Sequence, residues 1–563
     1  MAENESPAGM AEKETSAGTA QKETSPGTAA QNDNIEAIRD IAGGGWVRTA
    51  SARHATEAEH SLTILQGIKM YPQACFWAGV VSLVYIMDGY DTALMGSLFA
   101  FPNFQERFGV PQVGKPGSYQ VQAKWQTALG LASPLGNIVG IFVNSYMTER
   151  IGHKRSVLVT QFFLTGFIFI SFFAPSVEVL FVAQLLCGFA WGVFYTLAPA
   201  YASEVTPVVL RAYLETFVVL CSGIGQLISY GVLDGLLGNK TIWAWRIPFG
   251  VQWVWTIIIV PLVALAPESP WWLVRKGRLE DAVKSMKRLS SNQDETQIRN
   301  ALALMVETTE LERSMTEGAT YIDCFRGDNL WRTEIGCFTW LSQVLVGFGI
   351  TSYATYFFEQ AGLEPANAYK LTVGQGGLHF VAVALSVFLT ARYGRRSIYI
   401  VGCIIMSTSM FIIGFMAIPK QTQGTGYGSA AMYYVWYATY EATIGPIAYI
   451  IVGEVSSTRL RSNSIALGRN AYNVINIAAT CVVPHLLNPN ASDWKGKAAF
   501  LAAGFGILCT VWGWFRLPEL KDRTYEELDI LFSKGLRARE FARYEFNREV
   551  EIEAKLADFE HHE

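Results

Sequence analysis

Two aspartates, Asp88 and Asp91, stand in a stretch of sequence that is otherwise uncharged from Met70 to Gln105. Because they are three residues apart, they share one face of a helix. A carboxyl group inside an apolar helix can take up and release a proton, and ionisable residues within a membrane are functional by default. The alternative is a structural pair whose carboxylates are capped by hydroxyl or backbone groups. We interpret Asp88 and Asp91 as proton-binding groups.

The composition places these aspartates in a membrane protein. Of the 563 residues, 51% are hydrophobic and only 16% are charged, whereas soluble domains are about 25% charged. Windows such as 157–173 carry no charge over nearly the length of a bilayer-spanning helix. The net charge of −4 implies no nucleic-acid partner. The eight cysteines show no metal-ligand spacing, so we expect small core residues and neither a metal nor another cofactor.

Apolar stretches predict an all-α membrane protein with twelve transmembrane helices in two six-helix repeats. The expected spans are 71–95, 125–147, 157–173, 179–201, 213–236 and 247–265, then 334–358, 371–391, 397–417, 430–451, 464–487 and 498–517. The expected parts are a disordered cytosolic tail (1–65), an N-terminal half (66–266), a cytosolic central loop (267–333), a C-terminal half (334–518) and a cytosolic C-terminal tail (519–563). In the central loop, apolar residues recur at helical spacing over 277–291, which predicts short amphipathic helices.

Three signatures occur once in each half, which indicates an internal duplication. The sequence ERIGHKRS (149–156) matches ARYGRRS (391–397), YASEVTPVVLR (201–211) matches GEVSSTRLR (453–461), and PES (267–269) matches PEL (518–520). The charged residues that correspond are Arg150 with Arg392, Glu204 with Glu454, and Arg211 with Arg461.

The distribution of Lys and Arg predicts that both termini lie in the cytosol. The short loops carry equal numbers on the two sides, so the decision rests on the basic central loop and on the dense clusters in the repeated signatures. The glycosylation sequons at Asn239 and Asn490 then fall on outer loops. We expect a plasma-membrane protein.

The chain resembles the sugar porter family of the major facilitator superfamily over residues 65–535. The motifs that carry the resemblance are GYDTALMGS in the first span, the repeated signatures, and PESPWWLVRKGRLEDA at 267–282. Shorter runs, among them SYATYFFEQAG and GRNAYN, are more similar to fungal maltose-type α-glucoside permeases than to hexose carriers. The resemblance implies two six-helix halves that expose a central site alternately to each side.

The resemblance assigns the family's proton-coupling role to Asp91, and Asp88 matches an acid found three residues earlier in maltose-type permeases. Two departures affect the coupling. Gln184 stands where proton-coupled hexose carriers have an arginine, and Asn137 stands where maltose-type permeases have an acid. Proton symport is expected, its stoichiometry is open, and uncoupled transport stays an alternative.

The resemblance also implies a set of sugar contacts. These map onto Gln226, Gln343, Tyr449, and Asn470 or Asn473. Amides suit a hydroxyl-rich ligand because each offers donors and an acceptor together. The alternative for any one amide is a hydrogen bond between helices. Val344 and Tyr449 replace a glutamine and a tryptophan that hexose carriers commonly have, so the identity of the sugar is not inherited from them.

Other charged residues have two interpretations each. Arg469 and Glu441 either pair or line the cavity, or they lie near helix ends, and His379 is more often a packed histidine than a proton relay. The loop charges either anchor the topology or, as the resemblance implies, latch the cytosolic side shut in the outward-open state. The expected gate residues are Arg150, Glu204, Arg211, Arg392, Glu454 and Arg461.

Together these residues predict a secondary transporter, monomeric in the lipid bilayer, that imports an α-glucoside such as maltose by proton symport. One alternative is a carrier of another solute, either an uncoupled sugar facilitator or an exporter of a fungal metabolite. A sugar sensor is a further alternative, but the C-terminal tail leaves little room for a signalling domain. The sequence contains no nucleophile, metal or phosphate-binding constellation that points to an enzyme.

Overall fold

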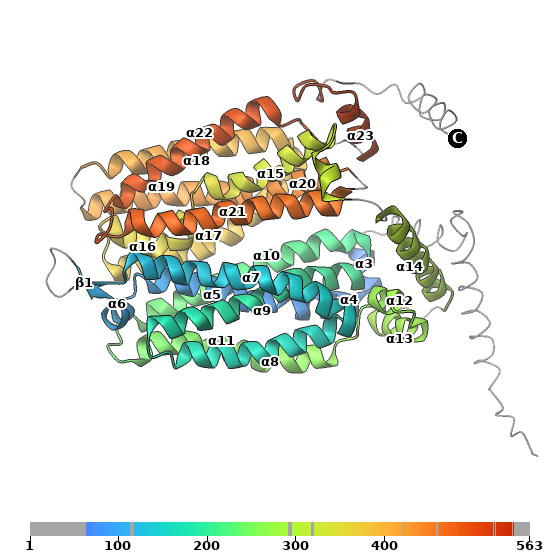
Figure 1. Cartoon of the computed structure of the whole chain (residues 1–563), viewed down its shortest axis with the longest axis horizontal. Helices are drawn as coiled ribbons and strands as arrows, with labels where there is room; N and C mark the ends of the chain where they lie inside the picture. Colours follow the sequence, from blue (N-terminus) through green and yellow to red (C-terminus); the bar gives the residue numbers. More distant parts are fainter. Residues whose placement is uncertain are drawn as a thin grey trace, which may run out of the picture.

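The computed structural model describes residues 64–112, 118–290, 295–316, 320–419, 422–457, 460–521, 523, 525–542 and 544. The expected N-terminal tail up to residue 63 and the end of the expected C-terminal tail lie outside these residues. Figure 1 shows two bundles of helices side by side, the N-terminal half in blue to green and the C-terminal half in yellow to red. Each half contributes six spans, as the repeated signatures predict.

The first half begins with a short helix, α3 (Ile64–Met70), and a span that is interrupted at Leu83. This first span consists of α4 (Pro72–Ser82) and α5 (Val84–Leu98). The next five spans are α7 (Ala123–Ile151), α8 (His153–Phe172), α9 (Val177–Val205), α10 (Val208–Leu236) and α11 (Trp243–Leu265).

The second half contains two interrupted spans. The seventh span breaks where Phe348 and Gly349 have φ angles of 41° and 72°, and the tenth span breaks at Thr443. The helices are α15 (Asn329–Leu345), η2 (Ile350–Tyr353) and α16 (Ala354–Gln360) in the seventh span, then α17 (Pro365–Arg392), α18 (Arg395–Met416), α19 (Gln423–Ala442) with α20 (Ile444–Val455), α21 (Arg461–Leu487) and α22 (Ala499–Arg516).

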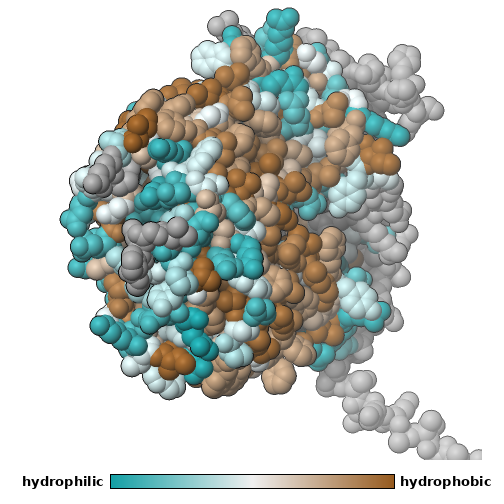
Figure 2. Space-filling view, turned by 60° about the vertical axis from the view of Figure 1, so that its left-hand side comes forward, coloured by the Kyte–Doolittle hydropathy of each residue, from teal (hydrophilic) through white to brown (hydrophobic). Residues whose placement is uncertain are grey.

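Nine spans of the described chain are individually long and apolar enough to cross a membrane. The remaining three are the interrupted first and tenth spans and the polar α21. Figure 2 shows hydrophobic side chains along the flank of the bundle and hydrophilic ones gathered at one end. This is the surface expected of a protein whose flank faces lipid.

The two ends of the bundle carry different elements (Figure 1). One end, which we call the hairpin side, carries α6 (Pro102–Phe108), the paired strands β1 (Val110–Pro111) and β2 (Tyr119–Gln120), and η4 (Lys495–Ala498). The opposite end, which we call the tail side, carries α12 (Pro270–Arg275), α13 (Leu279–Leu289), α14 (Glu295–Thr316), η1 (Tyr321–Phe325) and α23 (Tyr525–Ser533). The helix α13 is the amphipathic helix that the spacing predicts, with Leu279, Ala282, Met286 and Leu289 buried.

The halves contact each other closely at the hairpin side. The Ser97 hydroxyl of α5 lies 3.1 Å from the Thr355 hydroxyl of α16, and the Tyr369 hydroxyl of α17 donates to the Ser97 carbonyl at 2.5 Å. Asn488, which follows α21, donates to the Val121 carbonyl at 2.9 Å. These contacts join the two halves, so the structure has its hairpin side closed.

Within the first half, glycines bring α7 and α9 into direct backbone contact. A Cβ atom added at Gly140 would lie 2.1 Å from the Phe189 carbonyl oxygen, and one added at Gly192 would lie 2.2 Å from the Asn137 carbonyl oxygen. Small residues at such a crossing let membrane helices pack closely without a hydrophobic driving force. The packing fixes α9, which carries Gln184 and Trp191, two of the three groups that donate to Asp91.

We predict that Gly140→Ala destabilises the protein by about 1–3 kcal/mol, because the added methyl group forces α7 away from α9. The measurement is thermal unfolding of the purified protein in detergent. Gly166→Ala on α8 is the matched control, since a Cβ atom there meets nothing within 4 Å. Equal unfolding temperatures for the two variants would contradict the close crossing.

Candidate functional site

Asp91 is enclosed by neutral hydrogen-bond donors from two other helices. The indole N–H of Trp191 on α9 donates to Oδ2 at 3.1 Å. The amides of Gln184 on α9 and Gln252 on α11 donate to Oδ1 at 3.5 and 3.0 Å. The Asp91 residue is 2% exposed. An ionised carboxylate can therefore be held here by dipoles alone.

The same amides carry unused acceptors. The Oε1 atoms of Gln184 and Gln252 are buried and have no hydrogen-bond partner among the described residues. A protonated carboxyl group is a donor as well as an acceptor, and it needs an acceptor nearby. The surroundings of Asp91 therefore offer donors for the charged form, and either amide, turned over about its Cγ–Cδ bond, presents its oxygen as an acceptor to the neutral form.

Asp88 has a different environment, because it faces the second half. It is buried on α5, within hydrogen-bonding reach of the Tyr195 hydroxyl of α9. It also interacts electrostatically with Asp91 and with Arg469 of α21. Asp88 is thus linked to a cation on the opposite half, whereas the donors to Asp91 all belong to its own half.

Arg469 lies inside a group of aromatic side chains, which settles its position away from a helix end. Its guanidinium carbon is 5.0 Å from the centroid of the Trp340 ring and 4.5 Å from that of Tyr472. The Tyr449 ring meets Trp340 edge-on at 4.4 Å, and its residue is 58% exposed. Aromatic faces stabilise a cation through their quadrupoles. The expected sugar residue Tyr449 and the cation Arg469 therefore belong to one cluster.

The expected amide residues differ in their environments. Gln343 donates to the Gly445 carbonyl at 2.6 Å, so its amide nitrogen links α15 to the start of α20. This is the contact between helices that the sequence left open as an alternative. Gln226 is half-buried on α10. Asn473 is half-buried and lies one helical turn after Arg469, on the same face, whereas Asn470 is exposed and points about 100° away.

Glu441 and His379 form a pair, which answers the question left open for each of them. Nδ1 of His379 on α17 is 3.5 Å from Oε1 of Glu441 on α19. Both side chains are largely buried. The two are therefore partners inside the second half.

At the tail side, Glu268 caps the start of α8. Its Oε1 accepts the backbone N–H of His153 at 2.9 Å and that of Lys154 at 3.3 Å. Burial raises the pKa of Glu268, while these backbone donors oppose the rise. Glu519 caps α18 in the same way, since its Oε1 accepts the Arg395 N–H at 2.7 Å. The repeated PES and PEL motifs therefore supply equivalent helix caps.

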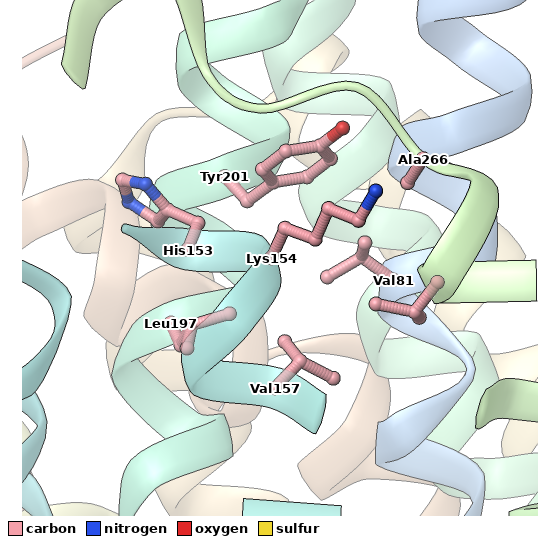
Figure 3. Close-up of a pocket in the computed structure, with 8 residues that line it drawn as sticks. Val81, His153, Lys154, Val157, Leu197, Tyr201 and Ala266 are labelled. Atoms are coloured by element: carbon pink, nitrogen blue, oxygen red, sulfur yellow. The ribbon is translucent and has the colours of Figure 1, made fainter. Parts of the chain in front are cut away.

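Figure 3 shows His153, Lys154 and Tyr201 around a cavity beside the Glu268 cap. The space between these side chains has no room for a water molecule. Small-molecule sites occupy roughly 300–1,000 Å³, so this cavity is too small for a disaccharide. It is a packing feature of the tail side.

The expected gate carboxylates pair with cations that the sequence did not select. Nη2 of Arg275 on α12 is 2.5 Å from Oε1 of Glu204, and Nη2 of Arg395 is 2.9 Å from Oε1 of Glu454. Each pair joins residues of one half or its adjoining loop. Neither pair crosses from one half to the other.

The remaining gate residues lie as follows. The guanidinium carbon of Arg150 is 4.2 Å from the Tyr146 ring centroid, and the backbone carbonyl of Arg392 accepts a hydrogen bond from Lys521 at 2.9 Å. The side chains of Arg211 and Arg461 lie outside the described part of the structure. Their role in a latch stays a prediction.

Several partners were missed by sequence reasoning. Trp191, Gln252 and Tyr195 reach the aspartates from other helices, and only Gln252 carried a signal, as a polar residue within an uncharged span. Arg395 was detectable in the repeat, because it corresponds to His153 in the first signature. Arg275 lies within the PESPWWLVRKGRLEDA motif itself.

Comparison with known proteins agrees with this arrangement. Residues 77–532 match the model of the family described as sugar (and other) transporter. The chain belongs to that family. It is a sugar transporter and not an enzyme.

The relatives of this sugar transporter include yeast permeases. The maltose permease MAL61 of Saccharomyces cerevisiae is 35% identical over 517 residues, which cover 91% of this chain and 83% of the relative. A general alpha-glucoside permease of the same yeast is 34% identical over 501 residues, which cover 88% and 81%. The xylose transporter XylE of E. coli, in a partially occluded inward open conformation, has the same fold, with a TM-score of 0.62, 20% identity and coverage of 80% and 99%.

We predict that Gln343→Leu destabilises this sugar transporter by about 1–3 kcal/mol even without sugar, because the Gly445 carbonyl loses its donor. Thermal unfolding in detergent measures the effect. Gln226→Leu is the control, and it should leave the unfolding temperature unchanged. If Gln343→Leu lowers sugar affinity but not stability, its amide serves the sugar and not α20.

Proposed function

We propose that this protein imports an α-glucoside such as maltose together with a proton, by alternating access to a site between its two halves. The relatives named above support the cargo class, since they are maltose and alpha-glucoside permeases. The observation that carries the proton part is the environment of Asp91. It offers three N–H donors to the carboxylate, and the two glutamine side chains also carry buried oxygen atoms that have no partner among the described residues.

In this mechanism Asp91 binds and releases the transported proton. Its donors are neutral, so no fixed cation keeps the carboxyl group ionised through the cycle. The Gln184 side chain, which stands where proton-coupled hexose carriers have an arginine, serves as one of these donors. Coupling to a proton draws on the membrane potential at about 2.3 kcal/mol per charge per 100 mV.

In this mechanism the charge state of Asp88 affects the second half through its attraction for Arg469. An ionised Asp88 attracts Arg469, whereas a protonated Asp88 does not. Since the two residues belong to opposite halves, this attraction contributes to the relative stability of the two conformations. Arg469 in turn lies against Trp340 and Tyr472, next to Tyr449, so cargo bound at these rings would respond to the same cation.

The sugar would lie between the halves, against Tyr449 and Trp340 and near Gln226 and Asn473. Aromatic faces pack against sugar C–H groups, and the amides supply directional hydrogen bonds. Because Asn473 and Arg469 share one face of α21, we favour Asn473 over Asn470 as the second amide. Gln343 acts mainly by holding the start of α20.

We place the tail side in the cytosol and the protein in the plasma membrane as a monomer. The basic central loop and the repeated basic signatures lie at the tail side, as the positive-inside rule requires. The structure would then be the inward-facing conformation, with the hairpin side closed toward the outside. Glu204, Glu454 and the neighbouring arginines would rearrange into a latch when the tail side closes.

We predict that adding maltose to de-energised cells that express the protein alkalinises the medium, and that Asp91→Asn abolishes this response. The asparagine cannot exchange a proton, but sugar counterflow, which needs no net proton movement, should persist. External pH recording and labelled-sugar counterflow measure the two effects. Asp234→Asn, at the hairpin-side end of α10, is the matched control and should behave as the unsubstituted protein does.

The outcomes separate the alternatives. Uptake without alkalinisation for every transported sugar would make the protein an uncoupled facilitator. Intact protein in the membrane with no uptake of any sugar would favour another solute.

The cargo itself is tested by uptake of labelled maltose, trehalose, sucrose, cellobiose and glucose. We predict that maltose uptake exceeds glucose uptake at equal concentration, because the relatives named above are maltose and alpha-glucoside permeases. The β-linked disaccharide cellobiose is the control for the linkage. Faster transport of cellobiose than of maltose would contradict an α-glucoside carrier.

A further inference from the structure

His379 lies at the contact between the two halves, on a different helix from Asp88 and Asp91. It is 5% exposed on α17, and its ring packs on α10 of the first half. A Cβ atom added at Gly223 of α10 would lie 2.4 Å from Cδ2 and 2.7 Å from Nε2 of His379. The absence of a side chain at Gly223 thus makes room for the Nε2 edge of the ring.

Both nitrogen atoms of the His379 ring face oxygen atoms. Nδ1 is 3.5 Å from Oε1 of Glu441 and 3.5 Å from the hydroxyl of Tyr437, both on α19. Nε2 has no hydrogen-bond partner among the described residues, and the backbone of Val219 on α10 lies close enough to interact with the ring. A neutral histidine carries one N–H, so it can satisfy only one of these two sides.

We propose that the His379–Glu441 pair is a proton-binding site separate from Asp88 and Asp91, and that a proton bound at Nε2 of His379 ties α17 to α10 across the two halves. The neutral ring keeps its hydrogen on Nδ1, toward Glu441. A proton taken from water then binds the free electron pair of Nε2, and the new N–H donates to the Val219 carbonyl. The positive charge of the ring is balanced by the Glu441 carboxylate.

The titratable side chains nearest the pair are tyrosines, and the cation Arg469 of α21 acts electrostatically on Tyr440, which also interacts with Glu441. The side chains that face it from the neighbouring helices are tyrosines, namely Tyr433, Tyr437 and Tyr440 of α19 and Tyr230 of α10. On α16 the only acid, Glu359, interacts with Tyr369 near the hairpin-side end of α17. The charged residues of α18 and α20 lie at their tail-side ends, at Arg395, Arg396 and Glu454. Glu441 is therefore the acid that balances the His379 proton.

This site makes the contact between the halves depend on pH. The Val219 contact exists in the conformation that is closed at the hairpin side, so proton binding at His379 favours that conformation. The dependence requires only that the halves move relative to each other. It does not depend on which solute is carried or on whether transport is coupled to Asp91.

The test uses the purified full-length chain without sugar, in an Asp88→Asn/Asp91→Asn background so that neither aspartate can titrate. Spin labels at the exposed positions Glu106 and Ser492 report the distance between the halves at the hairpin side. We expect the ratio of closed to open molecules to rise about tenfold as the pH falls from about 8 to 5, because the gained hydrogen bond involves a charged donor.

Three variants assign this transition to His379. His379→Gln should abolish it, since glutamine cannot gain a proton. Glu441→Gln should move its midpoint to lower pH, because the balancing anion is lost. Gly223→Ala should displace the ring and abolish the transition, whereas Gly231→Ala, whose Cβ atom meets nothing within 4 Å, is the matched control on the same helix and should retain it.

A transition that survives in His379→Gln, or a distance that does not change with pH in the double-asparagine background, would overturn the proposal. If that background does not fold, the same distances are compared between the otherwise unsubstituted protein and its His379→Gln variant. The pH-dependent change of distance should then appear in the unsubstituted protein and be absent from His379→Gln. The same pH dependence in both proteins would again overturn the proposal. A loss of sugar import in cells with the pH transition intact would refute the proposed function and leave this site standing.

Discussion

The cost of a charge inside a membrane governs the arrangement of this transporter. No water reaches the hydrocarbon region, so each ionisable group there needs a partner supplied by the bundle. The protein meets this constraint in two ways. Asp91 is held by neutral donors of its own half and His379 pairs with Glu441 inside the second half, while Asp88 interacts with Arg469 across the two halves. An interaction across the halves links a change of charge to the contact between them.

The helix packing makes these partnerships possible. Glycines let α7 and α9 approach until their backbones touch, which fixes the side of α9 that presents Gln184 and Trp191 to Asp91. At the tail side, Glu268 and Glu519 cap the starts of α8 and α18 in corresponding positions. The two halves therefore share one helix arrangement but differ in their buried charged residues. The first half has two acids on α5, and the second half has a histidine–glutamate pair on α17 and α19.

The fold could be predicted from the sequence because it depends on local patterns. Apolar stretches of membrane length and duplicated charged signatures indicate twelve spans in two repeats, and helical spacing indicates α13. The partners of the acids could not be predicted in this way. Gln184, Trp191 and Gln252 are 93, 100 and 161 residues from Asp91 in sequence, so their contacts depend on how α9 and α11 pack. The same holds for Gln343, for which the sequence left open a sugar contact or a hydrogen bond between helices, and whose Nε2 donates to the Gly445 carbonyl.

The central claim is that the Asp91 carboxyl group is protonated in one part of the transport cycle and ionised in another, while its hydrogen-bond partners stay uncharged. The infrared difference spectrum of the purified protein with and without its sugar tests this most directly, because a protonated carboxyl group has a C=O band that a carboxylate lacks. The account predicts a sugar-dependent carboxylic acid band that is missing in Asp91→Asn and shifted in Gln252→Leu, which removes one donor and one acceptor. An unchanged band in Asp91→Asn would contradict it.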